Sequence, residues 1–216
     1  MTQKSKTLPN SEIINKFTTY NAEMNAAMRN GDFDLANEYI EKIEALHDEY
    51  DFFDQEFTEN DLVAIDWHNG RRTPDADPLQ KGSIYGLTLA TTAPEIFKAL
   101  VEATAFGSRA INERLADEGL RIDTILAVGG ISKKSRFVMQ TMADVIGVPI
   151  RVVRSTQACA LGSAMNAAVA AGVYASVEEA QDAMSSGFDG EYIPNAERHE
   201  IYNALYERYL VAAYGK

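Results

Sequence analysis

The sequence predicts an α/β protein that begins with a helical hairpin. Apolar residues recur at helical spacing over the first 60 residues, and an apolar strand, a helix and a second apolar strand follow one another between residues 124 and 153. The chain has 216 residues, of which 46% are hydrophobic, and this composition is that of a globular protein with a core. We therefore expect a helical segment at 1–60 and an α/β domain at 61–216.

Charge and cysteine content exclude several classes of protein. Acidic residues outnumber basic ones by 32 to 20, so the net charge of −12 at pH 7 repels nucleic-acid backbones and anionic lipid. We therefore expect no nucleic-acid partner and no membrane partner. The single cysteine, Cys159, has no partner for an intramolecular disulfide, and its alanine-rich surroundings favour a small buried thiol. Because no signal peptide is visible, we expect a cytoplasmic protein.

The first 60 residues predict two helices joined by a tight turn. A first apolar stripe begins at Ile13 and ends at Gly31. A second stripe follows Asp34, which we expect to cap the second helix. The acidic, aromatic stretch 48–60 is expected to connect this αα-hairpin to the rest of the chain.

Apolar runs and the residues that end them predict the elements of the α/β domain. The run at 124–128 is continuous, which is typical of a buried parallel strand. The alanine-rich run at 158–171 is too weakly apolar for a membrane span and predicts a tightly packed buried helix. One face of the last helix is expected to pack inward through Tyr202, Leu205, Tyr206 and Tyr209. In chain order we expect strands at 62–65 and 83–89, a helix at 94–119, a strand at 124–128, a helix at 135–146, a strand at 150–153 and helices at 158–171, 177–184 and 195–214.

The sharpest local signal for a ligand is the pair Gly129-Gly130, which follows an expected strand. Glycines at the carboxyl end of a parallel strand let a ligand approach the backbone. The spacing fits neither the G-x-G-x-x-G pattern of dinucleotide sites nor the G-x-x-x-x-G-K-[ST] phosphate loop, so a purely structural turn stays an alternative. Residues that could cap the next helix or add positive charge at this corner are Ser132, Ser135, Lys133 and Lys134.

A second candidate is the loop with the sequence DWHNGRRTP at residues 66–74. It holds the only tryptophan of the chain, one of three histidines and two arginines. Ligands are often bound by loops on a rigid scaffold, but a solvated turn with Trp67 packed inward fits the residues equally well. His47, His68 and His199 have no second ligand at metal spacing, so we expect them at the surface and expect no metal site.

Four motifs occur in the order found in the FGGY carbohydrate kinases, and residues 61–214 resemble that family. The match is most similar to the C-terminal domain of the bacterial L-ribulokinases. The resemblance implies an actin-like ATPase fold, of the ribonuclease H-like class that sugar kinases share with Hsp70. The motifs are DWHNGRRTP at 66–74, EATAFG at 102–107, GGISKK at 129–134 and QACALGSA at 157–164.

The resemblance also implies a function and a site. The family uses ATP with Mg²⁺ to phosphorylate a small sugar, here L-ribulose, in the catabolism of L-arabinose. Adenosine would rest on the turn at Gly129 and Gly130, and Lys134 would contribute to the adenine pocket. Asn69 and Arg72 would lie in a loop on the substrate side.

In these kinases the catalytic base is an aspartate of an N-terminal domain, one phosphate loop is also N-terminal, and a Gly-Thr phosphate motif precedes the C-terminal domain. No such segments are visible here. We therefore expect no catalytic residue in this chain, a missing N-terminal kinase domain as its partner, and no activity in isolation. An exposed apolar face should also let the isolated chain form a homo-oligomer.

Two other interpretations of the sequence stay open. The chain could belong to another pentulose kinase of the same family, similar to the xylulokinases. It could also be a non-catalytic interaction module built on the hairpin and the aromatic last helix. An NAD-dependent oxidoreductase would need the G-x-G-x-x-G turn that the sequence lacks.

Overall fold

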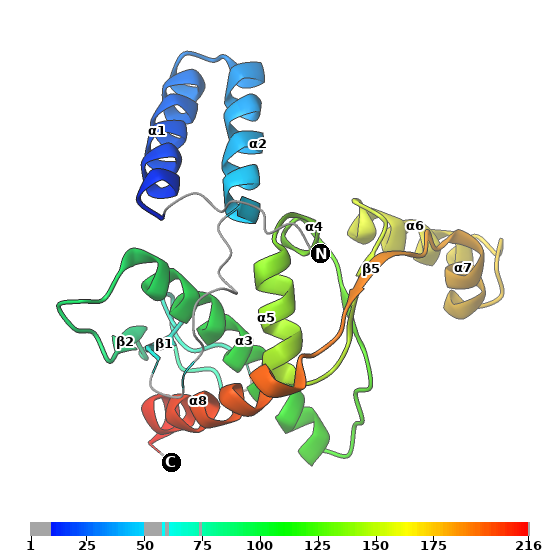
Figure 1. Ribbon diagram of the computed structural model, residues 1–216. Helices are drawn as coiled ribbons and strands as arrows, with labels where there is room; N and C mark the ends of the chain where they lie inside the picture. The colour runs from blue at the N-terminus through cyan, green and yellow to red at the C-terminus, as the bar shows by residue number, and fades with distance from the viewer. Residues whose placement is uncertain (1–9, 50–57, 59–60, 74, 216) are drawn as a thin grey trace, which may run out of the picture. The chain divides into compact units, whose positions relative to one another are not determined.

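The computed structural model describes residues 10–49, 58, 61–73 and 75–215 (Figure 1). These residues form two compact units. The smaller unit consists of an N-terminal helical hairpin together with Lys134–Arg136, and the larger unit contains the rest. Most of the connection expected at 48–60 lies outside the described residues.

Helices α1 (Asn10–Arg29) and α2 (Phe33–Glu49) form the hairpin that the apolar periodicity predicts. The rings of Tyr20 and Tyr39, one from each helix, lie 6.0 Å apart. Because both helices have an apolar stripe, they bury it against each other. The buried side chains of the pair include Ile13, Ala27, Ala36 and Leu46.

The cap of α2 differs from the prediction. The carboxylate of Asp32 accepts a hydrogen bond from the Leu35 N–H at 3.1 Å, so Asp32 is the capping residue. The helix already begins at Phe33, which places Asp34 inside the first turn. Both aspartates precede the apolar stripe, and the position of the turn at Gly31, with a φ of 74°, decides between them.

The chain after the hairpin alternates short strands with helices, as the sequence predicts. Nearly all expected elements are present, and their bounds differ from the predictions by a few residues. In chain order they are β1 (Val63–Ile65), β2 (Ser83–Tyr85), α3 (Ala93–Asp117), β3 (Ile125–Ala127), α4 (Ile131–Lys134), α5 (Arg136–Ile146), β4 (Ile150–Val153), α6 (Ala158–Ala170), α7 (Val177–Met184), β5 (Phe188–Tyr192) and α8 (Ala196–Tyr214).

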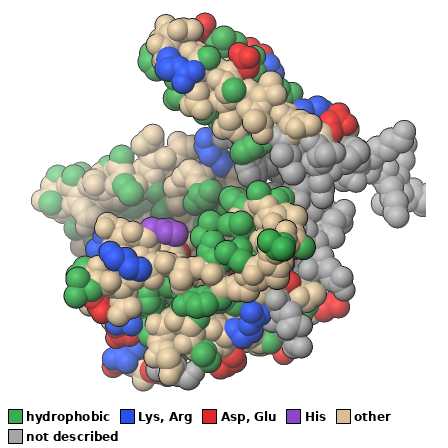
Figure 2. All heavy atoms as spheres, turned by 90° about the vertical axis from the view of Figure 1, so that its left-hand side faces the viewer, with side chains coloured by type: hydrophobic (Ala, Val, Ile, Leu, Met, Phe, Trp, Pro, Cys, Tyr) green, Lys and Arg blue, Asp and Glu red, His purple; other side chains and the backbone are tan. Residues whose placement is uncertain are grey.

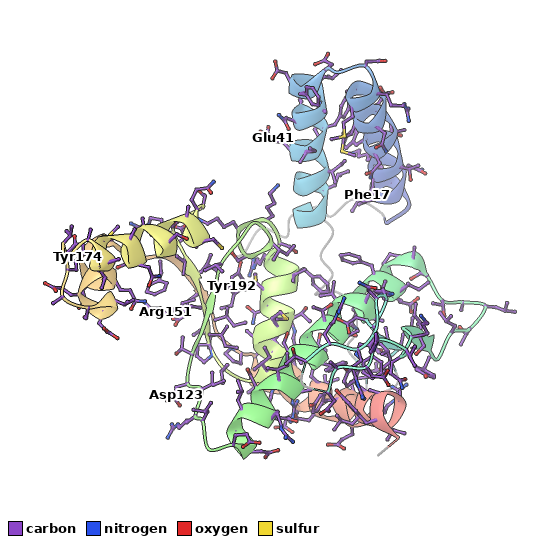
Figure 3. All side chains as sticks on the ribbon, turned by 180° about the vertical axis from the view of Figure 1, so that it is seen from behind. Phe17, Glu41, Asp123, Arg151, Tyr174 and Tyr192 are labelled. Carbon is purple, nitrogen blue, oxygen red and sulfur yellow. The ribbon has the colours of Figure 1, made fainter. Side chains whose placement is uncertain are left out.

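The strands form two separate sheets. β1 pairs with β2 in antiparallel orientation, with Ala64 opposite Ile84. β3 pairs with β4 in parallel and β4 pairs with β5 in antiparallel orientation, so β4 is the central strand of three. Figure 3 labels Arg151 on β4 and Tyr192 at the end of β5. The sequence does not predict β5, because its residues FDGEY contain a glycine and no alternation of apolar and polar side chains.

The core of the larger unit lies where α8 packs on α3 and β1. Phe106 of α3 is buried among rings of α8, and Val63 and Ile65 of β1 join the same cluster. A second cluster forms where α5 covers the three-stranded sheet. The predicted packing face of the last helix is confirmed, since all four of its residues are buried: Tyr202, Leu205, Tyr206 and Tyr209.

Two predictions of burial are wrong. Leu126 of β3 is 56% exposed and the following Val128 is 50% exposed. Side chains alternate between the two faces of a strand, and Ile125 and Ala127, on the opposite face from Leu126, are the ones that pack against the cluster with α5. Helix α6 buries one residue, Met165, and leaves Cys159 exposed. An alanine-rich run can pack closely but does not determine what covers it. No helix in the described part of the chain has both the length and the apolar content needed to cross a bilayer.

A buried polar network joins β1, α3 and α8. Lys98 forms an ion pair with Asp61, which precedes β1, and its Nζ lies 3.8 Å from Glu102 Oε1. The hydroxyl of Tyr202 donates a hydrogen bond to Glu102 Oε1 at 3.1 Å. Burial raises the pKa of Glu102 to about 8, and the charge of Lys98 opposes this shift. Since Asp61 already pairs with Lys98, Glu102 is the carboxyl group that keeps its proton.

We predict that the free energy of unfolding falls as the pH rises towards 8. Glu102 keeps its proton up to a pKa of about 8 in the folded state, whereas its ordinary value is 4.5. The folded state therefore binds more protons than the unfolded state across this range. The stabilisation is complete below the ordinary pKa and is lost as the pH rises through the folded value, at about 1.4 kcal/mol per pH unit and proton.

The test is urea unfolding at several pH values, with Glu102→Gln compared with the parent. The variant should show a flatter dependence, because the titrating group is gone. Glu113→Gln is the matched control, since Glu113 also lies on α3 and accepts a hydrogen bond from Tyr206 at 2.7 Å, but its side chain is 49% exposed. A parental slope in Glu102→Gln would contradict the assignment.

Candidate functional site

The pair Gly129-Gly130 forms the exposed turn that connects β3 to α4. Gly129 has a φ of 91°, which side chains rarely adopt, whereas Gly130 has an ordinary φ. No atom lies within 4 Å of a Cβ added at either glycine. The turn follows the carboxyl end of β3, which is parallel to β4. The backbone of the turn is therefore open to a ligand at the end of the sheet where α/β proteins bind one.

The turn is followed by α4, a single helical turn that the sequence does not predict, and α5 then begins at Arg136. Ser132 is buried, and its hydroxyl donates a hydrogen bond to the Gly129 carbonyl at 2.7 Å. Ser132 therefore lies inside α4 and does not cap it, so of the two serines that could act as the cap this one does not. The Lys133 N–H donates to the Gly130 carbonyl at 3.1 Å. These two bonds hold the turn against α4.

The two lysines of α4 differ in their surroundings. The ammonium group of Lys133 lies 2.7 Å from Asp189 Oδ2 of β5. Its charge is therefore neutralised, contrary to the expectation that it adds positive charge to this corner. Lys134, the expected adenine-pocket residue, is exposed at the end of α4.

The loop after β1 is built on Trp67, which is buried as one interpretation of the sequence predicts. The guanidinium group of Arg71 lies 5.3 Å from the centre of the Trp67 ring and 5.4 Å from that of Tyr214. Arg71 is therefore a structural residue of the loop. The candidate residues Asn69 and Arg72 are both exposed.

The turn and the loop belong to different sheets, since the loop follows β1 and the turn follows β3. Burial raises the pKa of Asp66 at the start of the loop, and a hydrogen bond with Thr104 opposes this shift.

No cluster of three histidine, cysteine or acidic side chains suited to a metal ion occurs within the described residues.

A groove of about 460 Å³ lies at the other end of the three-stranded sheet, near the amino ends of β3 and β4. Its cations already have partners: Arg109 pairs with Glu113 at 2.8 Å and Arg121 pairs with Asp123 at 2.6 Å. His199, which we expected at the surface, lines this groove in a half-buried position. Because a ligand anion would have to displace existing ion pairs, the groove is a weaker candidate than the turn.

Comparison with known proteins identifies the relatives of this chain. The sequence model of the "FGGY family of carbohydrate kinases, C-terminal domain" matches residues 15–171. The match begins inside α1, upstream of the domain start that we predicted at residue 61.

Two curated relatives are ribulokinases. The one from Vibrio parahaemolyticus is 47% identical over 150 residues, which are 66% of this chain and 26% of the relative. The one from Bacillus licheniformis is 43% identical over 164 residues, which are 73% of this chain and 30% of the relative. The chain thus spans less than a third of the length of these relatives.

Solved structures of sugar kinases share the fold. A ligand-bound xylulose kinase from Lactobacillus acidophilus has a TM-score of 0.65 and 28% identity, and the match covers 77% of this chain and 36% of that one. The xylulose kinase from Rhodospirillum rubrum also has a TM-score of 0.65, at 22% identity, and the match covers 94% of this chain and 37% of that one. The expected actin-like α/β fold is confirmed.

The two glycines of the turn should respond differently to alanine. Gly129→Ala should destabilise the protein by about 1–2 kcal/mol, because the methyl group is strained at a positive φ. Gly130→Ala should be neutral or stabilising by a few tenths of a kcal/mol, since its φ is ordinary and the space around it is open. Urea unfolding of both variants measures the difference. Equal stabilities would show that the turn does not hold this conformation in solution.

Proposed function

Because the chain belongs to the FGGY family of carbohydrate kinases, we propose that it forms the nucleotide-binding part of an ATP-dependent kinase that phosphorylates L-ribulose to L-ribulose 5-phosphate. The identity to ribulokinases, between 38% and 47%, supports L-ribulose as the substrate. The xylulose kinase is 28% identical, which makes xylulose the second candidate. We place this reaction in L-arabinose catabolism in the cytoplasm.

The observation that carries the proposal is the open backbone at Gly129-Gly130. Both glycines are exposed and leave space where a side chain would stand, so the turn fits the flat surface of an adenosine. We propose that adenosine binds against this turn with Lys134 beside the base. Asn69 and Arg72 would then lie on the sugar side. ATP, with Mg²⁺ on its phosphates, supplies the transferred phosphoryl group.

The catalytic base of this proposal belongs to an N-terminal kinase domain, which is the main partner that we propose. Apolar side chains that could meet it gather around β2 and the start of α3, on the face that Figure 2 shows. Large exposed apolar patches are typical of interaction surfaces. Without its partner, this face would favour a homo-oligomer. The exposed residues are Leu79, Tyr85, Leu87, Leu89 and Phe97.

The 216-residue chain should bind ADP in calorimetry but should form no ADP from ATP and L-ribulose. Adenosine binding needs only the turn and its neighbours in this chain, whereas phosphoryl transfer also needs a base and phosphate contacts that we place outside it. Ligand-dependent melting provides a second measurement, because ADP should raise the melting temperature by mass action. Stabilisation by NADH alone would favour an oxidoreductase, and stabilisation by neither ligand would favour an interaction module. Formation of ADP from ATP and L-ribulose by the chain itself would contradict the proposal that the catalytic base lies in a partner domain.

Gly130→Val should weaken ADP binding by tenfold or more while the melting temperature stays near that of the parent. The added side chain occupies space that is open in the folded protein and that the proposal assigns to adenosine. A loss of about 1.4 kcal/mol already corresponds to tenfold.

Ser163→Ala is the control for this variant. Its hydroxyl is exposed and donates to the Cys159 carbonyl at 3.1 Å within α6, so its removal should leave ADP affinity unchanged. Parental affinity in a folded Gly130→Val protein would mean that the turn is structural only.

A further inference from the structure

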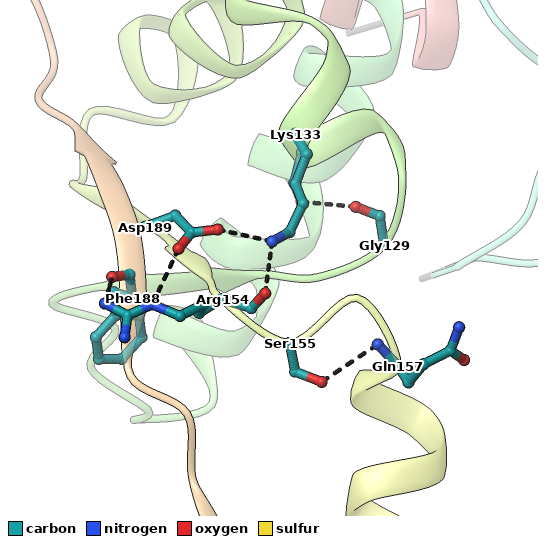
Figure 4. Close-up of polar contacts among 8 residues, drawn as sticks. Gly129, Lys133, Arg154, Ser155, Gln157, Phe188 and Asp189 are labelled. Carbon is teal, nitrogen blue, oxygen red and sulfur yellow. Dashed lines mark hydrogen bonds and ion pairs between the residues drawn. The ribbon is translucent and has the colours of Figure 1, made fainter.

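Lys133 connects the turn region to β4 and to the edge strand β5, at the same end of the three-stranded sheet as the turn. Its ammonium group donates to the Arg154 carbonyl at 2.6 Å and to Asp189 Oδ2 at 2.7 Å (Figure 4). Arg154 directly follows β4, and Asp189 lies in β5. One side chain of α4 thus contacts the ends of two neighbouring strands.

Asp189 holds two cations at once. Its second oxygen, Oδ1, accepts a hydrogen bond from Arg154 Nε at 3.1 Å, and the same guanidinium group donates to the Phe188 carbonyl at 3.0 Å. The hydrogen bond from Lys133 is the main reason why the pKa of Asp189 lies below its ordinary value. Both oxygens of the carboxylate are therefore used, and Lys133 and Arg154 are fixed relative to each other.

An irregularity in β5 gives Asp189 its position. Val152 lies opposite Gly190 and Val153 lies opposite Phe188, so the ladder skips Asp189. An extra residue of this kind forms a β-bulge, which locally twists the strand and redirects a side chain. The bulge is found at the one residue that bridges the two cations, and this coincidence points to a role for its carboxylate.

The turn at Gly129-Gly130 is held by two hydrogen bonds from α4. The glycines have no side chains, their backbone is held by the bonds from Ser132 and Lys133, and α4 has only four residues. A helix of one turn is not stable by itself. The position of the turn therefore depends on β3 before it and on the anchoring of α4 after it.

We propose that Asp189 is a positioning residue for the Gly129-Gly130 turn. By bridging Lys133 and Arg154, it fixes α4 against the ends of β4 and β5. The backbone of the turn is then held where the adenosine is to bind. This consequence for the nucleotide rests on the proposed function, whereas the fixing of the turn does not.

Amide hydrogen exchange of residues 129–134 in the 216-residue chain tests the anchor directly. Asp189→Asn and Lys133→Met should each speed exchange there about fivefold or more. The double variant should be no faster than Lys133→Met alone, because that substitution already removes the contact between Lys133 and Asp189. Lys133→Arg, which keeps a cationic donor, should restore most of the protection. Melting temperatures should change little, since exposed ion pairs contribute little to stability.

Glu191→Gln is the matched control. Glu191 lies two residues further along β5 and pairs with Arg151 at 4.0 Å, with both side chains about as exposed as that of Asp189. Its substitution should leave exchange at 129–134 unchanged. Parental exchange in Asp189→Asn, or an equal increase in Glu191→Gln, would overturn the proposal.

Calorimetry with ADP separates this proposal from the proposed function. Asp189→Asn should bind ADP about three- to tenfold more weakly than the parent. If exchange increases but ADP affinity is unchanged, the position of the turn does not matter for the nucleotide, and the positioning role fails. If the parent itself does not bind ADP, the proposed function fails, and the exchange experiment still decides whether Asp189 fixes the turn.

Discussion

The packing of α8 on Phe106 is the interaction on which the larger unit depends. The ring centre of Phe106 lies 6.2, 5.8 and 5.4 Å from those of Tyr202, Tyr206 and Tyr209. Burial of one such ring contributes on the order of 1.5–3 kcal/mol. Because β1 joins the same cluster, the contact connects the first strand of the unit to its last helix. β3 and the exposed turn lie between β1 and α8 in the sequence. The contact between β1 and α8 therefore closes the loop of chain to which they belong.

Two polar residues of α3, Glu102 and Arg109, lie beside the contact between Phe106 and α8. Glu102 and Arg109 lie about one helical turn on either side of Phe106, so they share its face of α3. Glu102 accepts a hydrogen bond from Tyr202, and the guanidinium group of Arg109 lies 4.2 Å from the centre of the Tyr206 ring. Arg109 also donates to Asn203 Oδ1 at 2.7 Å. These contacts each fit one register of α8 on α3, whereas aromatic packing alone would tolerate a shift. The buried carboxyl group is therefore part of how the interface is specified.

Much of this core could be predicted from the sequence, because burial imposes a period on it. The stripe of α8 and the strand at 150–153 were predicted correctly, and Trp67 packs inward as one interpretation required. Predictions of burial failed where burial depends on a neighbouring element that cannot be identified from the sequence pattern. β3 and α6 have the composition of buried elements, yet β3 is only partly buried and α6 buries only Met165. An apolar run shows what a segment can bury, and only the rest of the fold decides whether it does.

In the candidate site, too, some features can be predicted from the sequence and others depend on the fold. Gly129 and Gly130 are visible in the sequence, because a glycine pair after an apolar run indicates an unusual backbone. The contact between Lys133 and Asp189 is not visible, since the two residues lie 56 positions apart and charged side chains on a surface have no period. The bulge that places Asp189 lies in a strand that the sequence did not predict at all. A turn made of glycines has no side chains with which to fix itself, so its position has to be determined by residues outside it. A sequence motif can therefore identify an exposed glycine turn, but a contact such as that between Lys133 and Asp189 joins distant parts of the chain and follows only from the fold.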